Sequence, residues 1–300
     1  AKPSRRGRLI ALVTAVVVVA VAVTAWLVYA TNTKKTTAPT VIATVPVGKG
    51  ARDVAVDPQR HAAYVTNRED KTISVIDTTT NAAIPIGPFT NLGTQSMTDI
   101  AVDRDERMIG VTLNKIFEVD ETTGACTLLA SFTGTDNLTS LSFVPANPAS
   151  PDGPEMLVAA TDTGAVIRID IAGATATSTV IGDYGQSGGM DVISSGDIVY
   201  VRGFGTVATV DVGATTGQDY LAVIDPMNGW AATVVGAGTG FDKIFGVAFW
   251  GGQLYGFADG GAGAGSFLRL DRQTGAGTLL QAGTIRWFGA GVTTSTPIIP

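Results

Sequence analysis

The stretch from residue 54 to residue 77 most constrains the fold, because it holds three short strand patterns in a row. Segments 54–57, 63–67 and 73–77 are short runs of mostly apolar and β-branched residues, and turn residues separate them. Short runs of this kind between turns are typical of β-strands. Three such strands joined by tight turns predict one blade of a β-propeller.

A strand that ends in aspartate and runs into a turn recurs along the whole chain. The aspartates that mark it are Asp77, Asp120, Asp170, Asp225 and Asp271, at spacings of 43, 50, 55 and 46 residues. Four-stranded propeller blades recur at about 40–50 residues. A carboxylate at the first position of a tight turn can accept the backbone N–H two residues on, so we interpret these aspartates as structural and not as metal ligands.

The other strands fit around this marker. We expect innermost strands at 54–57, 99–103, 139–144, 189–194 and 244–250. Second strands are expected at 62–66, 108–112, 156–160, 198–202 and 253–257, and outer strands at 82–86, 127–132, 178–181, 232–235 and 278–282. Segments 288–293, 297–300 and 41–47 can supply a sixth blade that joins the two ends of the chain. We therefore predict an all-β, six-bladed β-propeller over residues 41–300, with five blades as the alternative.

The N-terminal part has a different composition. Residues 9–30 carry no charge, and 22 residues at about 1.5 Å each are enough to cross a bilayer. The basic tail 1–8 holds four cationic side chains, which predicts a cytoplasmic N-terminus and an extracytoplasmic body. A retained transmembrane helix is favoured by its length over a cleaved signal peptide, which would make the body secreted. Residues 31–40 are polar and are expected to form a linker.

Charge and cysteine content exclude several kinds of function. Without residues 1–8, the chain has 16 basic and 26 acidic side chains and a net charge of −10, so phosphate backbones would be repelled and nucleic-acid binding is not expected. Cys126 is the only cysteine, so no intramolecular disulfide can form, and we expect a small buried side chain there. His61, the only histidine, is expected in a turn away from any central site. No cofactor and no metal site is predicted.

Residues 41–84 closely resemble the bacterial and archaeal YVTN-type β-propeller repeats of surface-layer and secreted proteins, including the tetrapeptide Tyr64-Val65-Thr66-Asn67. The order of basic tail, apolar span, Thr-rich linker and propeller is also similar to the C-terminal half of bacterial transmembrane Ser/Thr kinases with an extracellular sensor propeller. That second resemblance concerns layout only, because the chain carries no kinase motif. The sequence begins at Ala1 without a methionine, which leaves open whether another domain precedes it.

Candidate site residues follow from propeller geometry. Loops that enter innermost strands and loops that leave second strands meet on one face, around the mouth of the central channel, where ligands bind in concave surfaces. The long loop expected at 203–219 is a further candidate for specificity. By position, the predicted ligand-binding residues are Arg52, Asn67, Arg68, Asp136, Asp162, Tyr184, Arg202, Asp242, Asp259 and Trp287.

Three functions are compatible with these features. The first is a membrane-anchored, extracytoplasmic propeller that binds a ligand or a protein without catalysis. The second is a propeller enzyme of the lactonase, lyase or hydrolase kind, in which Asp136, Asp162, Asp242 and Asp259 would be candidate metal ligands. The third is a structural cell-surface module that assembles with copies of itself.

Overall fold

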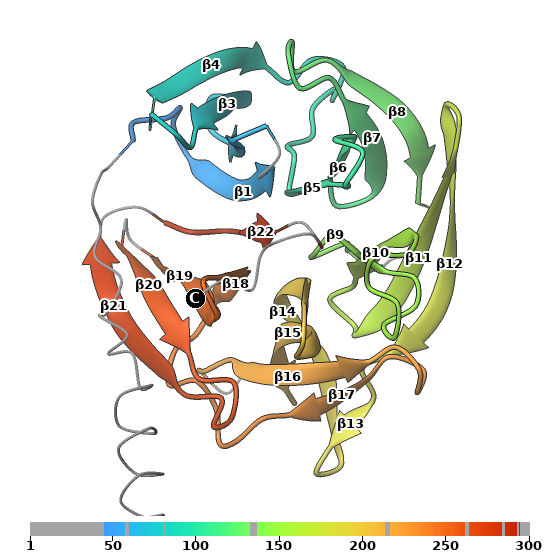
Figure 1. Cartoon of the computed structure of the whole chain (residues 1–300), viewed down its shortest axis with the longest axis vertical. Coiled ribbons are helices and arrows are strands. Elements are labelled where there is room, and N and C mark those ends of the chain that lie inside the picture. Colours follow the sequence, from blue (N-terminus) through green and yellow to red (C-terminus); the bar gives the residue numbers. More distant parts are fainter. Residues whose placement is uncertain are drawn as a thin grey trace, which may run out of the picture. The chain divides into compact units, whose positions relative to one another are not determined.

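The computed structural model describes residues 45–57, 60–80, 82–132, 137–213, 217–261, 264–283, 286–292 and 294. Their strands form five sheets that surround a common centre (Figure 1). The fold is therefore an all-β propeller, as predicted. Within the described residues the blades number five, so the six-bladed expectation is wrong and the five-bladed alternative holds.

In each blade, four antiparallel strands follow one another from the centre of the ring to its rim, and two of the sheets carry one further short strand. Blade 1 comprises β1 (Ala51–Asp57), β2 (Ala62–Asn67), β3 (Thr72–Asp77) and β4 (Ala82–Pro88), and blade 2 comprises β5 (Asp99–Val102), β6 (Met108–Val111), β7 (Lys115–Val119) and β8 (Cys126–Ser131). Blade 3 comprises β9 (Ser142–Pro145), β10 (Glu155–Ala160), β11 (Ala165–Ala172) and β12 (Thr175–Asp183). Blade 4 comprises β13 (Gln186–Ser187), β14 (Met190–Val201), β15 (Gly205–Val212), β16 (Tyr220–Asp225) and β17 (Ala231–Val234), and blade 5 comprises β18 (Ile244–Trp250), β19 (Gln253–Gly261), β20 (Ala264–Leu270) and β21 (Gly277–Gly283).

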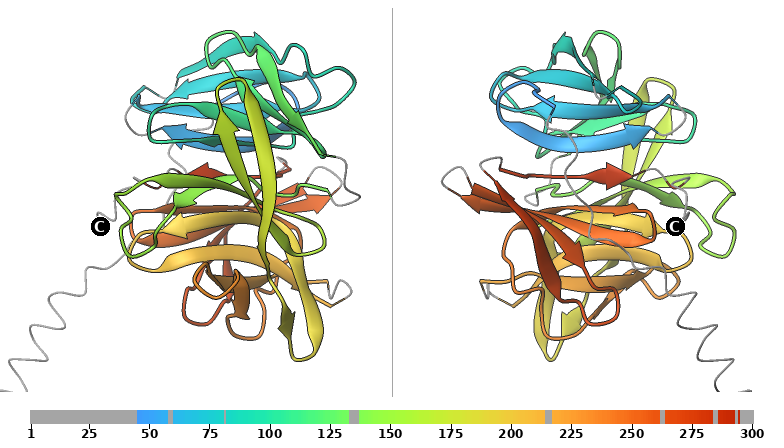
Figure 2. Two further views of the ribbon diagram at one scale, coloured as in Figure 1. Left: turned by 90° about the vertical axis from the view of Figure 1, so that its right-hand side faces the viewer. Right: turned by 60° about the vertical axis from the view of Figure 1, so that its left-hand side comes forward.

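The last strand closes the ring in a way that the sequence did not indicate. Strand β22 (Gly291–Val292) pairs in parallel with β1, opposite Ala55 and Val56, as the innermost strand of the first sheet. Figure 2 shows β22, in dark red, running beside the blue β1. The segment expected to begin a sixth blade is instead a closing strand of blade 1. Of the other segments expected in that blade, 297–300 and residues 41–44 of 41–47 lie outside the described residues, and 45–47 is not in a strand.

Blade 4 differs from the strand assignment made on the sequence. Segments 189–194 and 198–202 were expected to be two strands, but they form the single strand β14, which is interrupted by a register shift between Ser194 and Ile198. The sequence Ser195-Gly196-Asp197 resembles a turn, yet it forms a bulge. The second main strand of the blade is β15, so residues 205–212 of the expected loop 203–219 are strand.

The turn aspartates have the role that the sequence predicted in four of the five cases. Asp77 Oδ1 accepts the backbone N–H groups of Thr79 and Thr80 at 2.8 and 3.0 Å. Asp120, Asp225 and Asp271 accept equivalent bonds. Asp170 is the exception, because β11 continues to Ala172 and the carboxylate pairs with Arg168 instead.

The core lies between the blades. Four clusters of buried apolar side chains each join two neighbouring sheets, namely blades 1 and 2, 2 and 3, 3 and 4, and 4 and 5. Cys126 belongs to the first of these clusters and is 2% exposed, which confirms its predicted burial. Sheet-to-sheet packing around a ring therefore replaces a single central core.

The predicted membrane segment 9–30 lies outside the described residues. Among the residues that are described, no helix is long and apolar enough to cross a bilayer.

Candidate functional site

One face of the propeller carries the loops that enter the innermost strands and leave the second strands, and we call it the mouth face. The described loops on this face are 45–50, 68–71, 89–98, 112–114, 137–141, 161–164, 184–185, 188–189, 217–219, 235–243 and 286–290. The opposite face carries the hairpins between first and second strands. This division decides which side chains can share a site.

Cationic and aromatic side chains meet on the mouth face where blade 5 adjoins blade 1. The guanidinium carbons of Arg52 and Arg286 lie 4.9 and 4.8 Å from the centroid of the Phe288 ring. Phe245 stacks on Phe288 with centroids 5.8 Å apart and an angle of 8° between the rings. Two cations on one ring make favourable cation–π contacts and concentrate positive charge at the channel mouth.

The arginines of this group differ in their partners. Arg286 forms a two-pronged ion pair with Asp259, with Nε and Nη2 at 2.7 and 2.6 Å from the carboxylate oxygens. Arg52 donates its Nε to the carbonyl of Thr98 at 3.2 Å. Within the described part of the chain, neither Arg52 nor Arg68 forms an ion pair. The positive charge of these two side chains is therefore available to a ligand.

The pKa of Arg52 is affected by the charged groups around it. Burial and the nearby charge of Arg68 lower the pKa of the Arg52 guanidinium, and Arg286 acts in the same direction. The carboxyls of Asp99 and Asp53 beneath it act against this shift. Like charges held together at a partly buried position are more typical of a binding site than of a structural contact.

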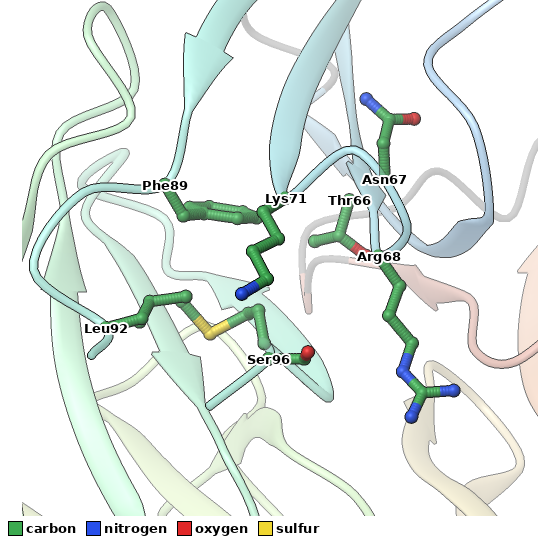
Figure 3. A pocket seen from close by; sticks show the side chains of 8 residues that line it. Thr66, Asn67, Arg68, Lys71, Phe89, Leu92 and Ser96 are labelled. Carbon is green, nitrogen blue, oxygen red and sulfur yellow. The ribbon is translucent and has the colours of Figure 1, made fainter. Parts of the chain in front are cut away.

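A shallow depression lies beside this group, between the β2–β3 turn and the loop before β5 (Figure 3). It is open to solvent and spans about 200 Å³, and its apolar lining residues are Phe89, Leu92 and Met97. The side chain of Lys71 points into the depression, whereas Arg68 extends away from its rim. The depression adds a further cation to the mouth face but has no enclosed volume for a ligand.

Three buried carboxyl groups lie at corresponding positions of innermost strands, and we call Asp53, Asp99 and Asp197 the axial carboxyls. They are 2–4% exposed. Asp53 Oδ2 accepts the N–H of Ile100 on blade 2 at 2.7 Å, and Asp197 Oδ2 accepts the N–H of Ala290 at 2.8 Å. Each of these bonds connects one blade to another segment of the ring. Asp53 and Asp197 are thus latches between blades, whereas Asp99 accepts the N–H of Ile100 on its own strand at 2.8 Å.

Burial raises the pKa of all three axial carboxyls, because a desolvated carboxylate is unfavourable. For Asp99 the neighbouring carboxyls of Asp53 and Asp197 raise it further. All three carboxyls lie beneath the surface that a ligand would touch.

A fourth carboxyl connects blades 4 and 5. Asp219 is 1% exposed, accepts the N–H groups of Ile244 and Lys243 at 2.6 and 3.2 Å, and accepts the hydroxyl of Ser195. Burial raises its pKa to about 6. Its acceptor positions are used within the protein, so it too is a latch.

The predicted residues Arg52, Arg68, Asp259 and Trp287 all lie on the mouth face at blades 1 and 5. Trp287 packs against Phe257 with ring centroids 5.3 Å apart. Asp162 is also on the mouth face, but on blade 3, where it accepts the side-chain amide of Asn137 at 2.7 Å. Exposed Asp242 lies on the loop before β18.

Two further predicted residues are buried and do not face solvent. Asn67 is 0% exposed and donates its amide to Thr72 and Ser74, both at 2.9 Å, so it braces the β2–β3 turn. Tyr184 is also 0% exposed and belongs to the cluster between blades 3 and 4. Both residues came from the correct loops, but their side chains point inward.

Arg202 lies on the wrong side of the propeller for the predicted site. It is in the hairpin between β14 and β15, on the opposite face, and pairs with Asp152 in the hairpin between β9 and β10. The error follows from treating β14 as two strands, because one extra strand exchanges the two faces. Asp136 lies outside the described residues.

The carboxylates proposed as metal ligands do not form a metal centre where the structure describes them. Asp259 is engaged by Arg286, and Asp162 by Asn137. Within the described ranges, no group of three or more His, Cys, Asp or Glu side chains could hold a metal ion. The metal-dependent enzyme therefore gains no support from these residues.

Sequence reasoning missed Arg286, Phe288 and the axial carboxyls. The sequence does hold a signal for two of the axial carboxyls. Asp53-Val-Ala-Val-Asp57 and Asp99-Ile-Ala-Val-Asp103 repeat the same pattern on adjacent blades. Phe288 begins the segment 288–293, which was expected to form part of a sixth blade, and Arg286 lies two residues before it. No local pattern marks them.

No protein-family model matches the chain, and no curated protein matches it. Among solved structures, a PQQ-bound aldose sugar dehydrogenase from Streptomyces coelicolor is similar with a TM-score of 0.54 and 16% identity, over 83% of this chain and 88% of that one. A chain of a nidogen/laminin complex has a TM-score of 0.55 and 13% identity, over 81% and 84%. At such identities the likeness shows the β-propeller fold alone. The YVTN-type and sensor resemblances stay predictions.

Proposed function

We propose that this protein is a non-catalytic binding propeller whose ligand or partner docks on the mouth face where blades 1 and 5 meet. This proposal rests on one observation: the guanidinium groups of Arg52 and Arg286 both lie over the ring of Phe288. Aromatic and arginine side chains concentrated at one concave end of a rigid scaffold are typical of recognition surfaces.

The state of the carboxyl groups supports binding over catalysis. A general acid or base must be able to reach substrate, and a nucleophile needs an adjacent base. The described carboxyls with raised pKa values nearest the axis, Asp53, Asp99 and Asp197, are buried and bonded to backbone N–H groups. Asp259, which does lie at the mouth, is neutralised by Arg286. We also propose, from the sequence alone, that residues 9–30 anchor the propeller on the extracytoplasmic side of a membrane.

Ligand-observed NMR on the purified full chain tests this function. The library should contain sugars, sugar lactones, organic acids and acidic peptides, and each spectrum should be followed for hours. We expect selective binding without any change in the composition of the mixture. Conversion of a lactone or another compound at an enzyme-like rate would contradict the proposal.

The location of binding needs a matched pair of variants. Arg68→Gln removes a cation from the mouth face, and Arg202→Gln removes one from the opposite face. We expect only the first to weaken binding. Equal effects would show that the mouth face is not the docking surface.

A further inference from the structure

We propose that Arg52, Arg68 and Arg286 form an oxyanion subsite, which takes a carboxylate or another doubly coordinating oxyanion of the ligand. This inference rests on the proposed function and names the chemistry that the mouth face recognises. A guanidinium presents a planar fork of N–H donors that matches the two oxygens of a carboxylate.

The three arginines keep guanidinium N–H donors that are not bonded to described residues, and a carboxylate ligand needs such donors. Arg286 uses Nε and Nη2 for Asp259, and this ion pair holds its side chain in place over Phe288. Arg52 uses Nε for Thr98, which leaves its two terminal nitrogens without a bond to any described residue. The side chain of Arg68 has no hydrogen-bond partner in the described part of the chain. Pre-positioned donors of this kind lower the cost of ordering a site upon binding.

The burial of Arg52 makes its charge effective. Arg52 is half-buried, stacked on Phe288, and fixed on both sides, since its carbonyl also accepts the N–H of Phe288 at 3.0 Å. A desolvated guanidinium interacts more strongly with an anion than a fully hydrated one. Arg68 lies beside the start of β1, the strand that carries Arg52, because its backbone N–H donates to the carbonyl of Gly50 at 2.7 Å. An oxyanion between Arg52 and Arg68 would also relieve the repulsion between these two cations.

The charge of the rest of the protein makes this subsite specific. Residues beyond the basic tail have a net charge of −10, so general electrostatics repel anions from the surface. Anion binding by this chain therefore requires a local group of cations. The mouth face at blades 1 and 5 supplies that group.

Calorimetric titration of the full chain tests the subsite with matched probes. Succinate and its neutral analogue succinamide differ in charge and share a skeleton, and inorganic sulfate distinguishes a general oxyanion site from a carboxylate site. Ionic strength is kept constant with sodium chloride. We expect succinate to bind and succinamide not to bind. A wild-type chain that binds neither succinate nor sulfate would overturn the inference.

Variants decide where the anion binds. Arg68→Gln should raise the Kd for succinate about tenfold or more, because a charge-assisted bond is lost. The Kd of Arg68→Lys should lie between those of the wild type and Arg68→Gln, since lysine keeps the positive charge but lacks the planar pair of N–H donors. Arg202→Gln on the opposite face is the control and should leave the Kd unchanged. Arg68 is exposed, so its variants should fold, which circular dichroism verifies.

The outcomes separate the two proposals. If library compounds bind but Arg68→Gln has no effect on succinate, the oxyanion subsite is wrong and the binding function stands. If the chain converts a compound while succinate binding still depends on Arg68, the non-catalytic function is wrong and the subsite stands.

Discussion

Oδ2 of Asp53 on β1 accepts a hydrogen bond of 2.7 Å from the backbone N–H of Ile100 on β5, so one buried carboxyl joins two blades. Its other oxygen accepts the N–H of Val54 at 2.7 Å. A propeller has few covalent or hydrogen-bonded connections between its sheets, and such latches fix the angle between neighbouring blades.

The first prediction concerns this latch. Asp53→Ala should lower the free energy of unfolding by about 2–4 kcal/mol, because a buried and a partly buried N–H group lose their acceptor. Asp53→Asn should cost no more than about 1 kcal/mol, since the amide oxygen still accepts one bond and a buried charge is removed. Urea denaturation at neutral pH measures both. Asp170→Ala, on an exposed strand position, is the control, and an equal loss there would contradict the latch.

The second prediction concerns pH. The pKa of Asp219 is about 6 in the folded protein, against an ordinary 3.8. A raised carboxyl pKa means that the folded state binds the proton more tightly than the unfolded state. This group therefore stabilises the fold most below about pH 4, and that contribution is lost as pH rises to about 6, by about 3 kcal/mol.

Asp219→Asn cannot titrate and should flatten this part of the pH dependence. Urea unfolding at about pH 4 and about pH 7 would measure the change for the wild type and the variant. Asp225→Asn, at an exposed turn, should keep the wild-type slope. An unchanged slope in Asp219→Asn would show that other groups cause the pH dependence.

The third prediction concerns closure of the ring. A β-carbon on Gly289 would lie 2.6 Å from Oδ1 of Asp53, whereas a β-carbon on Gly291 would meet nothing closer than 3.5 Å. Gly289→Ala should therefore destabilise the fold by about 1–3 kcal/mol through overpacking against the latch. Gly291→Ala, two residues along the same segment, should change stability by less than about 0.5 kcal/mol. Thermal unfolding compares the two, and similar losses would contradict this account of closure.

The fourth prediction concerns the single thiol. Cys126 is buried between blades 1 and 2, and burial raises the pKa of its thiol to about 12. Only the thiolate reacts readily, so the native protein should not react with Ellman's reagent, while the urea-unfolded protein should react fully. Rapid labelling under native conditions would show that the interface between these blades opens.

The sequence by itself was enough for the class of fold and for most strands. Alternation of apolar residues and aspartate turns are local signals, because a strand and its turn are decided within a few residues. The turn at Asp77 follows from its own neighbours, and the structure confirms it. At Ser195-Gly196-Asp197 the local sequence predicted a turn, but the structure has a bulge there. Arg202 was therefore predicted on the mouth face and lies on the opposite face.

Tertiary structure alone decided how the ring closes and what the mouth contains. The number of blades depends on which strand pairs with the short β22. The two residues of β22 form no sequence pattern that would predict pairing with β1. The candidate site combines Arg52 from the start of the ring with Arg286 and Phe288 from its end. Residues more than 200 positions apart meet there only because closure brings the last segment back to the first blade, and such non-local contacts leave no periodic signal in the sequence.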